Sequence, residues 1–347
     1  MSQPELFEFE ERCEKIGRIK SPLRRLNRAV NWEQFRPILR GVRERDRTDN
    51  SGRPAYDVVL MFKILVVQSL YNLSDDETEY QILDRYSFSE FVGLRASDKV
   101  PDAKTIWLFR EQLKELQLLD KLFACFERTL REEGFHAKKG SIVDATIVEA
   151  ERQHNTPEEN EQIKRGEIPQ SFLTNPNKLC QKDLDGRWTR KREVNYFGYK
   201  NHLCADVAHK LIRKYKVTAA SVHDSQPVAE LLDPDNTNGD VYGDSAYRSA
   251  EISRSLAKYK YRDRIHRRPY RNHPLTDREM RSNTTKSRTR VRVEHVFGRT
   301  LQLCKVTTVR LIGLMRATTA IGMRNLAYNL DRYAYLASRG RSKVATA

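Results

Sequence analysis

The spacing of apolar residues changes near residue 140. Before that point they recur three and four positions apart, which predicts amphipathic helices. Ser74 and Glu77 match the capping-box pattern, and Asp102 is a typical N-cap residue. The predicted helices run from about 54 to 72, onward from 74, onward from 102, and from about 119 to 133. Four short helices with tight connections fit a helix-turn-helix DNA-binding unit, and they fit equally a bundle that serves only packing or dimerisation.

After Gly140, short runs rich in β-branched residues predict strands. The expected strands are 141–148, 196–207, 211–222, 241–244 and 261–265, with helices near 226–232, near 249–259 and around Glu294. Three strands followed by alternating helix and strand predict an α/β fold, a mixed sheet flanked by helices. The segment 151–193 is polar and rich in Asn, Gln, Lys and Pro, so we expect a long loop that is either mobile or functional.

Three carboxylates stand out against this pattern. Asp144 interrupts a run of Ile, Val and Ala typical of a buried strand, where an ionised group needs a cation or several donors to compensate it. Asp244 follows a brief strand, and Glu294 lies in a segment with helical spacing. The residues alone leave structural explanations open: a satisfied core carboxylate at Asp144, a turn residue at Asp244, and an ion pair between Glu294 and Arg290.

The net charge of the chain bears on the kind of molecule that it binds. The sequence has 63 Lys and Arg against 47 Asp and Glu, a net charge of +16, which favours phosphate-bearing partners, although many merely soluble proteins are equally basic. Residues 258–299 hold 14 Lys and Arg against four acids, so much of the excess surrounds Glu294.

Cysteine usage and hydropathy bear on the compartment. The five cysteines are scattered and odd in number, which argues against a disulfide framework and a structural zinc site and fits a reducing cytoplasm. The sequence shows no signal peptide and no membrane-spanning run. We therefore expect a cytoplasmic, nucleoid-associated protein with no membrane partner.

Five short strings, in order, resemble a known family. They are Asp144-Ala-Thr146, Tyr196-Phe-Gly-Tyr-Lys-Asn-His202, Ser221-Val-His-Asp-Ser225, Val241-Tyr-Gly-Asp-Ser-Ala-Tyr-Arg248 and Arg290-Val-Arg-Val-Glu-His-Val-Phe-Gly298. Together they look like bacterial insertion-sequence transposases of the DDE class, closest to insertion-sequence family five, and the resemblance covers nearly the whole chain. It implies an RNase-H-like core, with the first acid on strand one, the second on or after strand four, and the third on a later helix.

The resemblance also implies a division of the chain. The expected regions are an N-terminal arm at 1–50, an all-helical DNA-binding or assembly domain at 51–137, an RNase-H-like DDE catalytic domain at 138–310, and a C-terminal helix with a basic tail at 311–347.

The implied chemistry is two-metal phosphoryl transfer. Asp144, Asp244 and Glu294 are expected to hold two Mg²⁺ or Mn²⁺ ions. The enzyme would bind the ends of its element as double-stranded DNA, cleave there and join the 3′ ends to target DNA. Joining two ends to one target implies a homo-oligomer, a dimer or higher. Two alternatives share these features: an RNase-H-fold nuclease without strand transfer, and a transposase-derived DNA-binding repressor, which would be expected to lose an acid.

Related families often carry a signature around the third acid: Tyr, two residues, Arg, three residues, Glu, six residues, Lys. Arg290 fits it, one helical turn before Glu294, and is expected to hold a phosphate oxygen or to orient the acid. Ser287 and Leu301 stand where the signature has Tyr and Lys, which leaves the phosphate contacts open. The candidate substitutes and further DNA-contact residues are Arg299, Lys305, Trp188, Arg267, Arg268 and Arg271.

The remaining polar residues near these strings have structural interpretations. Packing of Trp188 on the sheet edge is an equal alternative to DNA stacking. Asp224 is interpreted as a helix cap rather than a catalytic acid. Lys200 and His202 alternate on the second strand and are interpreted as ladder residues with exposed tips, and His295 is expected to point away from the metals.

Overall fold

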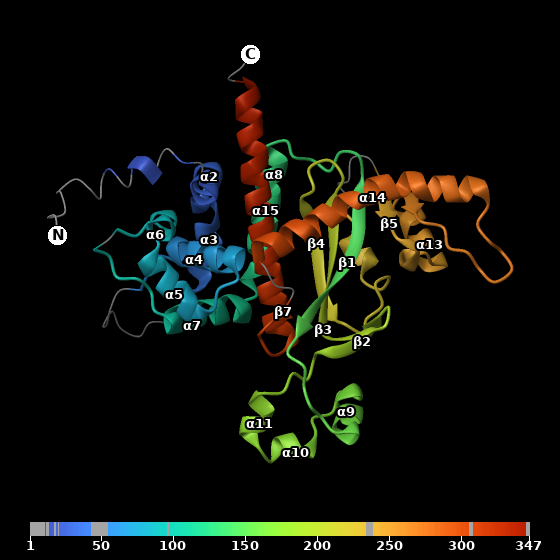
Figure 1. Cartoon of the computed structure of the whole chain (residues 1–347), viewed down its shortest axis with the longest axis horizontal. Helices are drawn as coiled ribbons and strands as arrows, with labels where there is room; N and C mark the ends of the chain where they lie inside the picture. The colour runs from blue at the N-terminus through green and yellow to red at the C-terminus, as the bar shows by residue number, and fades with distance from the viewer. Residues whose placement is uncertain are drawn as a thin grey trace, which may run out of the picture.

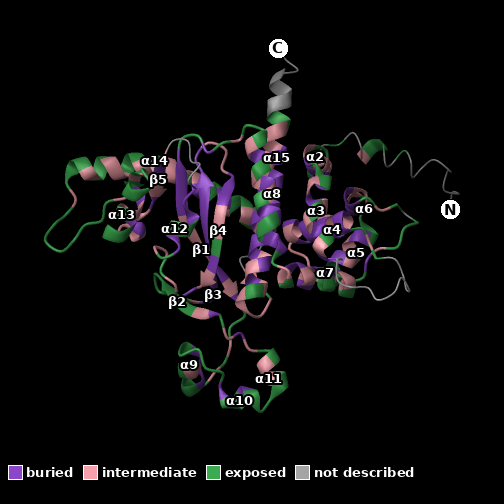
Figure 2. Cartoon of the chain, turned by 180° about the vertical axis from the view of Figure 1, so that it is seen from behind, coloured by how far each residue is buried: buried purple, intermediate pink, exposed green. Residues whose placement is uncertain are grey.

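The chain forms a helical half and a mixed-sheet half on either side of one long C-terminal helix, α15 (Leu314–Val344), as Figure 1 shows for this computed structural model. The structure describes residues 21–42, 55–95, 97–233, 239–304 and 308–344, together with 11, 14–16 and 19; of 304 and 340–344 only the backbone is described. Buried positions gather along α15 and the neighbouring strands (Figure 2).

The helical half is built from short helices with distinct caps. Its described elements are α2 (Pro22–Ala29), η1 (Trp32–Phe35), α3 (Arg36–Leu39), η2 (Arg40–Val42), α4 (Val58–Tyr71), α5 (Asp75–Asp84), α6 (Tyr86–Val92), α7 (Ala103–Glu115) and α8 (Leu118–Glu132). The side chain of Asp57 caps α4, which therefore starts at Val58 rather than near Pro54; Pro54 itself lies outside the described residues. Ser74 and Asp102 cap α5 and α7, as predicted.

Residues 21–42, expected in the N-terminal arm, belong to the core. Leu26, Trp32 and Phe35 are buried, and the ring of Trp32 packs edge-on against Phe62 of α4 with centroids 6.1 Å apart. One continuous hydrophobic core joins these helices to α15 and to one face of the sheet. The helical half is thus held in place by the last helix of the chain.

The sheet has the strand order expected of an RNase-H-like core. Its strands are β1 (Ser141–Ala150), β2 (Arg187–Lys191), β3 (Val194–Asp206), β4 (Ile212–Ala219), β5 (Asp240–Gly243), β6 (Arg262–Ile265) and the short β7 (Thr308–Val309). The main order is β4-β3-β1-β5-β6, while β2 also pairs with β3 and β7 with β1. β3 is antiparallel to β1 and β4, whereas β5 is parallel to β1 and β6. The predicted fold class is confirmed.

The two faces of the sheet are covered by different helices. α12 (Val228–Leu231) and α13 (Ala250–Lys258) form a small core with Val143 and Cys204. α14 (Asp277–Cys304) and α15 cover the other face, where Ile142 and Leu203 are buried. α14 crosses over β1 and β5 and extends beyond the sheet, as Figure 1 shows.

The expectation that 151–193 is one long loop is wrong in its secondary structure. This segment contains α9 (Pro157–Lys164), α10 (Gln170–Leu173), α11 (Pro176–Cys180) and strand β2, and the three helices hang below the sheet in Figure 1. Thr156 and Glu159 form a capping box that starts α9. Phe172 is fully buried, with the ammonium groups of Lys178 and Lys182 over its ring. Local caps and one aromatic anchor therefore order a segment whose composition is polar.

None of the described helices is by itself long and apolar enough to cross a membrane. α4 and α5, which meet at a bend of 102°, satisfy the length and composition criteria only as a pair.

Candidate active site

Asp144 and Asp244 stand at the same level on neighbouring strands. β1 and β5 run parallel, with Ile142 opposite Tyr242. Each aspartate comes two residues after that pair, and paired strands lie about 4.8 Å apart. Asp144 is within β1, whereas Asp244 follows β5 and accepts a hydrogen bond (2.8 Å) from the backbone N–H of Ala246, as the cap of η3 (Ser245–Tyr247).

Helix α14 brings Arg290 and Glu294 to the aspartates. Val293 and Val296 are buried and fix the inner face of the helix. Arg290 Nη1 donates to Asp144 Oδ2 at 2.8 Å, and Arg290 Nη2 lies 3.8 Å from Glu294 Oε1. The Glu294 side chain is 58% exposed and that of Asp144 only 15%. Arg290 therefore bridges a buried and an exposed carboxylate.

The electrostatics of Asp144 are unfavourable for a charged group. Burial raises its pKa to about 6, against the opposing effect of the Arg290 guanidinium and the Ala145 N–H. The neighbouring carboxylates of Asp244 and Glu294 raise the pKa further. The positive charge of Arg290 thus only partly compensates the negative charges of Asp144, Asp244 and Glu294.

Sequence reasoning missed Tyr247. Its side chain is 1% exposed, and its hydroxyl finds no hydrogen-bond partner within the described part of the chain. Burial raises the pKa of this phenol, and so do the negative charges of Asp144, Asp224 and Asp244. Tyr247 follows Asp244 by three residues in the same short turn, and this spacing is the signal that could have found it.

Lys200 and His202 lie on the face opposite to Asp144. The register places Leu203 opposite Asp144, and side chains alternate along a strand, so the flanking even-numbered residues point the other way. His202 is fully buried, with Nε2 2.8 Å from Thr218 Oγ1, and burial lowers its pKa to about 4. The expectation of exposed tips is wrong, because the segment leading into α12 covers this face.

The interpretation of Asp224 as a helix cap is also wrong. α12 begins only at Val228, after Pro227, and no side chain caps it. The Asp224 carboxylate instead pairs with Lys200 Nζ at 2.8 Å.

The predicted DNA-contact residues are spread over several elements. Trp188 on β2 is 46% exposed and also packs on Phe197, with ring centroids 5.4 Å apart, so both of its interpretations stand. Arg267 pairs with Glu279, whereas Arg268 and Arg271 are simply exposed in the connection from β6 to α14.

The signature positions on α14 have local partners. Ser287 Oγ lies 3.3 Å from Nε2 of His266, whose pKa is lowered by burial and by the charge of Arg290. Leu301 is 48% exposed. Arg299 donates to Asp331 of α15, and Lys305 lies outside the described residues. His295 is exposed and lines a cavity on the side of α14 turned toward α15.

Comparison with known families identifies the family to which the chain belongs. A sequence model described as "Transposase domain (DUF772)" matches residues 11–112, and one described as "Transposase DDE domain" matches residues 136–330, more than half of the chain. The chain belongs to the DDE transposase family. It is a DNA transposase, and its family carries out metal-dependent DNA cleavage and strand transfer. The narrower assignment to insertion-sequence family five stays a prediction.

One solved structure is similar to this transposase over much of its length. It is the cryo-EM structure of the piggyBac transposase synaptic complex with hairpin DNA, with 14% sequence identity and a TM-score of 0.45; the similarity covers 93% of this chain and 77% of that one.

The acidic residues fit the divalent metal that the family uses. As placed, no three His, Cys, Asp or Glu side chains of the described residues converge on one point, and Glu294 is the member turned toward solvent. The chemistry of the donors nevertheless suits Mg²⁺ or Mn²⁺, which prefer carboxylate oxygens. The raised pKa of Asp144 marks a buried charge that a cation would stabilise.

The contacts of Arg290 lead to a kinetic prediction. Arg290→Lys keeps the charge but loses the guanidinium fork that spans Asp144 and Glu294, so we expect the strand-cleavage rate to fall by roughly 10- to 100-fold. Affinity for duplex DNA should change by no more than about twofold, because the charge remains. Single-turnover nicking and fluorescence anisotropy measure the two quantities. Arg288→Lys, an exposed position on the same helix, is the control; equal rates for both variants would reduce Arg290 to a surface ion pair.

Proposed function

We propose that this DDE transposase binds the terminal repeats of its own insertion sequence, cleaves there and joins the freed 3′ ends to target DNA. One observation supports the proposal: Asp144 and Asp244 lie on adjacent parallel strands, and Arg290 of α14 contacts both Asp144 and the more exposed Glu294. An acidic set at the meeting point of two strands and a covering helix suits in-line displacement at phosphorus, which needs positioning and charge stabilisation rather than a covalent protein intermediate.

Each residue of the set has a distinct part. Asp144, Asp244 and Glu294 would hold two Mg²⁺ or Mn²⁺ ions, which when bound stabilise the negative charge that develops at phosphorus. Arg290 orients Asp144 and has N–H groups left for a phosphate oxygen. Tyr247 fills the space behind the aspartates and excludes water there. Hydrolysis of a phosphodiester leaves a 3′ hydroxyl. That hydroxyl then attacks a phosphorus of the target strand, and a new P–O bond forms as the target's 3′ oxygen leaves.

Recognition and assembly are assigned to the rest of the chain. In our proposal the helical region at 51–137 binds the element ends or mediates assembly, and at least two protomers act together, because two ends meet one target. The other two regions of the proposed division are the catalytic region at 138–310 and the C-terminal helix with its tail at 311–347. The shared core with α15 means that the helical region has to be studied within the whole chain.

The connection from β6 to α14 is expected to bind the DNA backbone without sequence preference. Replacing Arg267, Arg268 and Arg271 by Ala together should weaken binding to all duplexes alike and lower the slope of log affinity against log salt by roughly 2 to 3. Anisotropy titrations between low and moderate salt, on end DNA and on random duplex, measure both effects. A loss confined to end DNA would contradict this role and move these arginines to sequence recognition.

The proposed function is tested with the purified full chain and DNA from immediately outside its coding frame. In Mg²⁺ we expect nicks at one defined position on each side and products in which the new 3′ ends are joined to a second duplex. Nicks without joining would favour the RNase-H-fold nuclease. Binding without any nick would favour the transposase-derived repressor.

A further inference from the structure

A cavity of about 500 Å³ opens beside the acidic site, on the flank of α14 that faces α15. Its walls come from α2, α14, α15 and the turn between β3 and β4. The charged side chains that line it are Arg25, Lys210, Arg299 and Arg332 against Glu294 and Asp331. Four cations and two acids leave the cavity positive, and Glu294 belongs both to its rim and to the acidic set.

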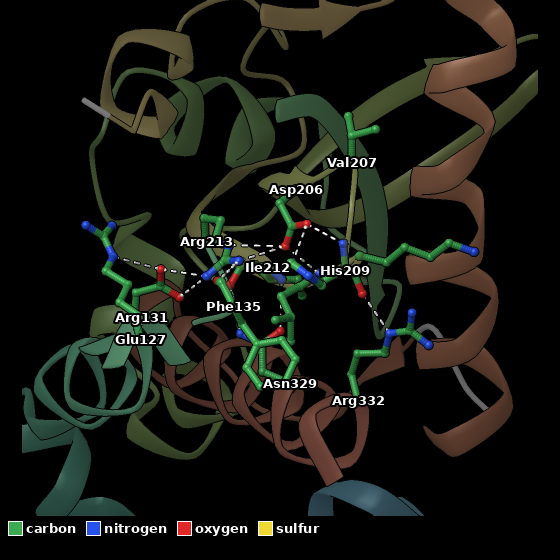
Figure 3. A network of polar contacts seen from close by, with 12 residues as sticks. Glu127, Arg131, Phe135, Asp206, Val207, His209, Ile212, Arg213, Asn329 and Arg332 are labelled. Atoms are coloured by element: carbon green, nitrogen blue, oxygen red, sulfur yellow. Dashed lines mark hydrogen bonds and ion pairs between the residues drawn. The ribbon is translucent and has the colours of Figure 1, made fainter. Parts of the chain in front are cut away.

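The turn that carries Lys210 is built rigidly. Asp206 is fully buried and accepts hydrogen bonds from the backbone N–H groups of His209 and Leu211 and from the Arg213 guanidinium, a network drawn in Figure 3. From outside, Arg332 Nε donates to the backbone oxygen of His209 at 2.7 Å, which Figure 3 also shows. The buried Asp206 carboxylate and a contact from α15 therefore hold the turn that carries residue 210.

Two further hydrogen bonds, one from α14 and one from α15, hold the turn between β3 and β4. Arg292 Nη1 of α14 donates to the Val207 oxygen at 2.7 Å, and the Tyr328 hydroxyl of α15 donates to the Lys210 oxygen at 2.6 Å. Residue 210 adopts a left-handed backbone conformation with φ of 61°. Lysine is less favourable than glycine in that conformation, which Lys139 and Lys260 of this chain also adopt.

The cations of this cavity repel one another. No acidic side chain among the described residues pairs with Lys210. Burial lowers the pKa of its ammonium, and the charges of Arg332 and Arg292 lower it further. Asp331 is engaged by two other cations, Arg25 Nη2 at 3.2 Å and Arg299 Nη2 at 2.9 Å. Within the part of the chain that the structure describes, Lys210 and the neighbouring Arg332 thus have no acidic partner, and a bound anion would supply the missing counter-charge.

We propose that this cavity binds a backbone phosphate of the DNA strand that continues to the acidic site. The inference rests on the proposed function. A phosphate accepts several charge-assisted hydrogen bonds at once and matches donors that converge from a turn and two helices. Because Glu294 lines the cavity and lies next to Arg290, which contacts Asp144, a strand held here would continue toward the carboxylates. The cavity would set the register of the strand relative to the scissile bond.

Lys210→Gly is the decisive substitution, because glycine adopts the left-handed conformation without strain and keeps the backbone contacts of the turn. The matched control is Lys216→Ala, which removes the same charge from β4, where Lys216 pairs with Glu230 on the face opposite to Asp144. Binding of a duplex oligonucleotide is measured by anisotropy in EDTA over a range of salt, and nicking is measured separately in Mg²⁺.

We expect Lys210→Gly to reduce duplex affinity by about tenfold and the salt slope by about one, whereas Lys216→Ala leaves both near the parent values. Equal behaviour of the two variants, or a parent protein that binds no duplex, overturns the phosphate site. The outcomes separate the two proposals. If the parent protein cleaves DNA and Lys210→Gly has no effect on binding, the proposed function stands and the phosphate site is wrong. If binding depends on Lys210 but the parent protein never cleaves DNA, the phosphate site stands and the proposed function is wrong.

Discussion

Asp144→Asn, Asp244→Asn and Glu294→Gln are each expected to abolish nicking and joining in Mg²⁺, with a loss in rate of at least about a thousandfold. Each substitution preserves size while removing a negative oxygen ligand. Duplex binding should stay within a few-fold of the parent value, because the cationic surfaces are untouched. Strand cleavage of labelled end DNA and anisotropy measure the two properties on the same samples.

The control for this series is Glu230→Gln. Glu230 is an exposed carboxylate of the same half of the chain that pairs with Lys216 on the face opposite to Asp144, so nicking should persist at close to the parent rate. Asp144→Cys sharpens the test: it should be inactive with Mg²⁺ and partly active with Mn²⁺, which accepts sulfur more readily. Full activity of any carboxylate variant in Mg²⁺ would remove that residue from the site, and for Asp144 or Asp244 it would overturn the mechanism.

Sequence predicted the elements whose signals are local. Ser74 and Asp102 are side-chain caps that act over three residues, and both helices start where these residues predict. The β-branched run around Asp144 has a period of two and forms the central strand β1. The placement of Asp144 on strand one and of Asp244 after strand four followed from the family resemblance, since nothing in the two strands themselves specifies which neighbours they pair with.

The segment 151–193 and the strand residues Lys200 and His202 differ from their predictions, because polar composition is a poorer guide than caps and strand register. The polar segment 151–193 contains the capping sequence from Thr156 to Glu159, which was readable, and the anchor Phe172, whose burial was not. Lys200 and His202 share a strand with Leu203, and only the register with Asp144 decides which of them faces the acids. Register is a property of paired strands, so a single sequence could not supply it.

Other features depend on contacts between distant parts of the chain. Asp331 of α15 pairs with Arg25 of α2, 306 residues away, and that pair forms one wall of the cationic cavity. The turn at 207–210 is held in place by hydrogen bonds from α14 and α15, which come from distant parts of the chain. Periodicity along the chain predicts that α15 has a buried face, but it does not say which elements cover that face.

Asp144→Asn is expected to stabilise the metal-free protein at pH 8 by on the order of 2 to 3 kcal/mol, and Asp206→Asn is expected to destabilise it. Both aspartates are buried, on the neighbouring strands β1 and β3. Burial raises the pKa of Asp144 to about 6 because Arg290 compensates it incompletely. At Asp206 burial also acts to raise the pKa, but hydrogen bonds from His209 and the charge of Arg213 outweigh it and hold the pKa below the ordinary value.

The pH dependence follows from these opposite directions. The folded state binds a proton at Asp144 more tightly than the unfolded chain, so its penalty is complete above about pH 6 and disappears as the pH falls toward 4, where both states are protonated. The gain of Asp144→Asn should therefore vanish near pH 4. Asp206 contributes stability above its unfolded pKa and loses it as the pH falls through the lowered folded value, so the cost of Asp206→Asn should shrink in acid.

Urea unfolding in EDTA at pH 8 and near pH 4 measures both variants. Mg²⁺ adds a second readout, since an ion that binds only the folded state raises its stability in proportion to the logarithm of its concentration. The parent should gain stability with Mg²⁺ and Asp144→Asn should gain little, whereas Asp206→Asn should respond like the parent. A destabilised Asp144→Asn at pH 8 would show that Arg290 compensates the buried carboxylate fully, and the case for an incompletely neutralised metal site would then rest on the cleavage data alone.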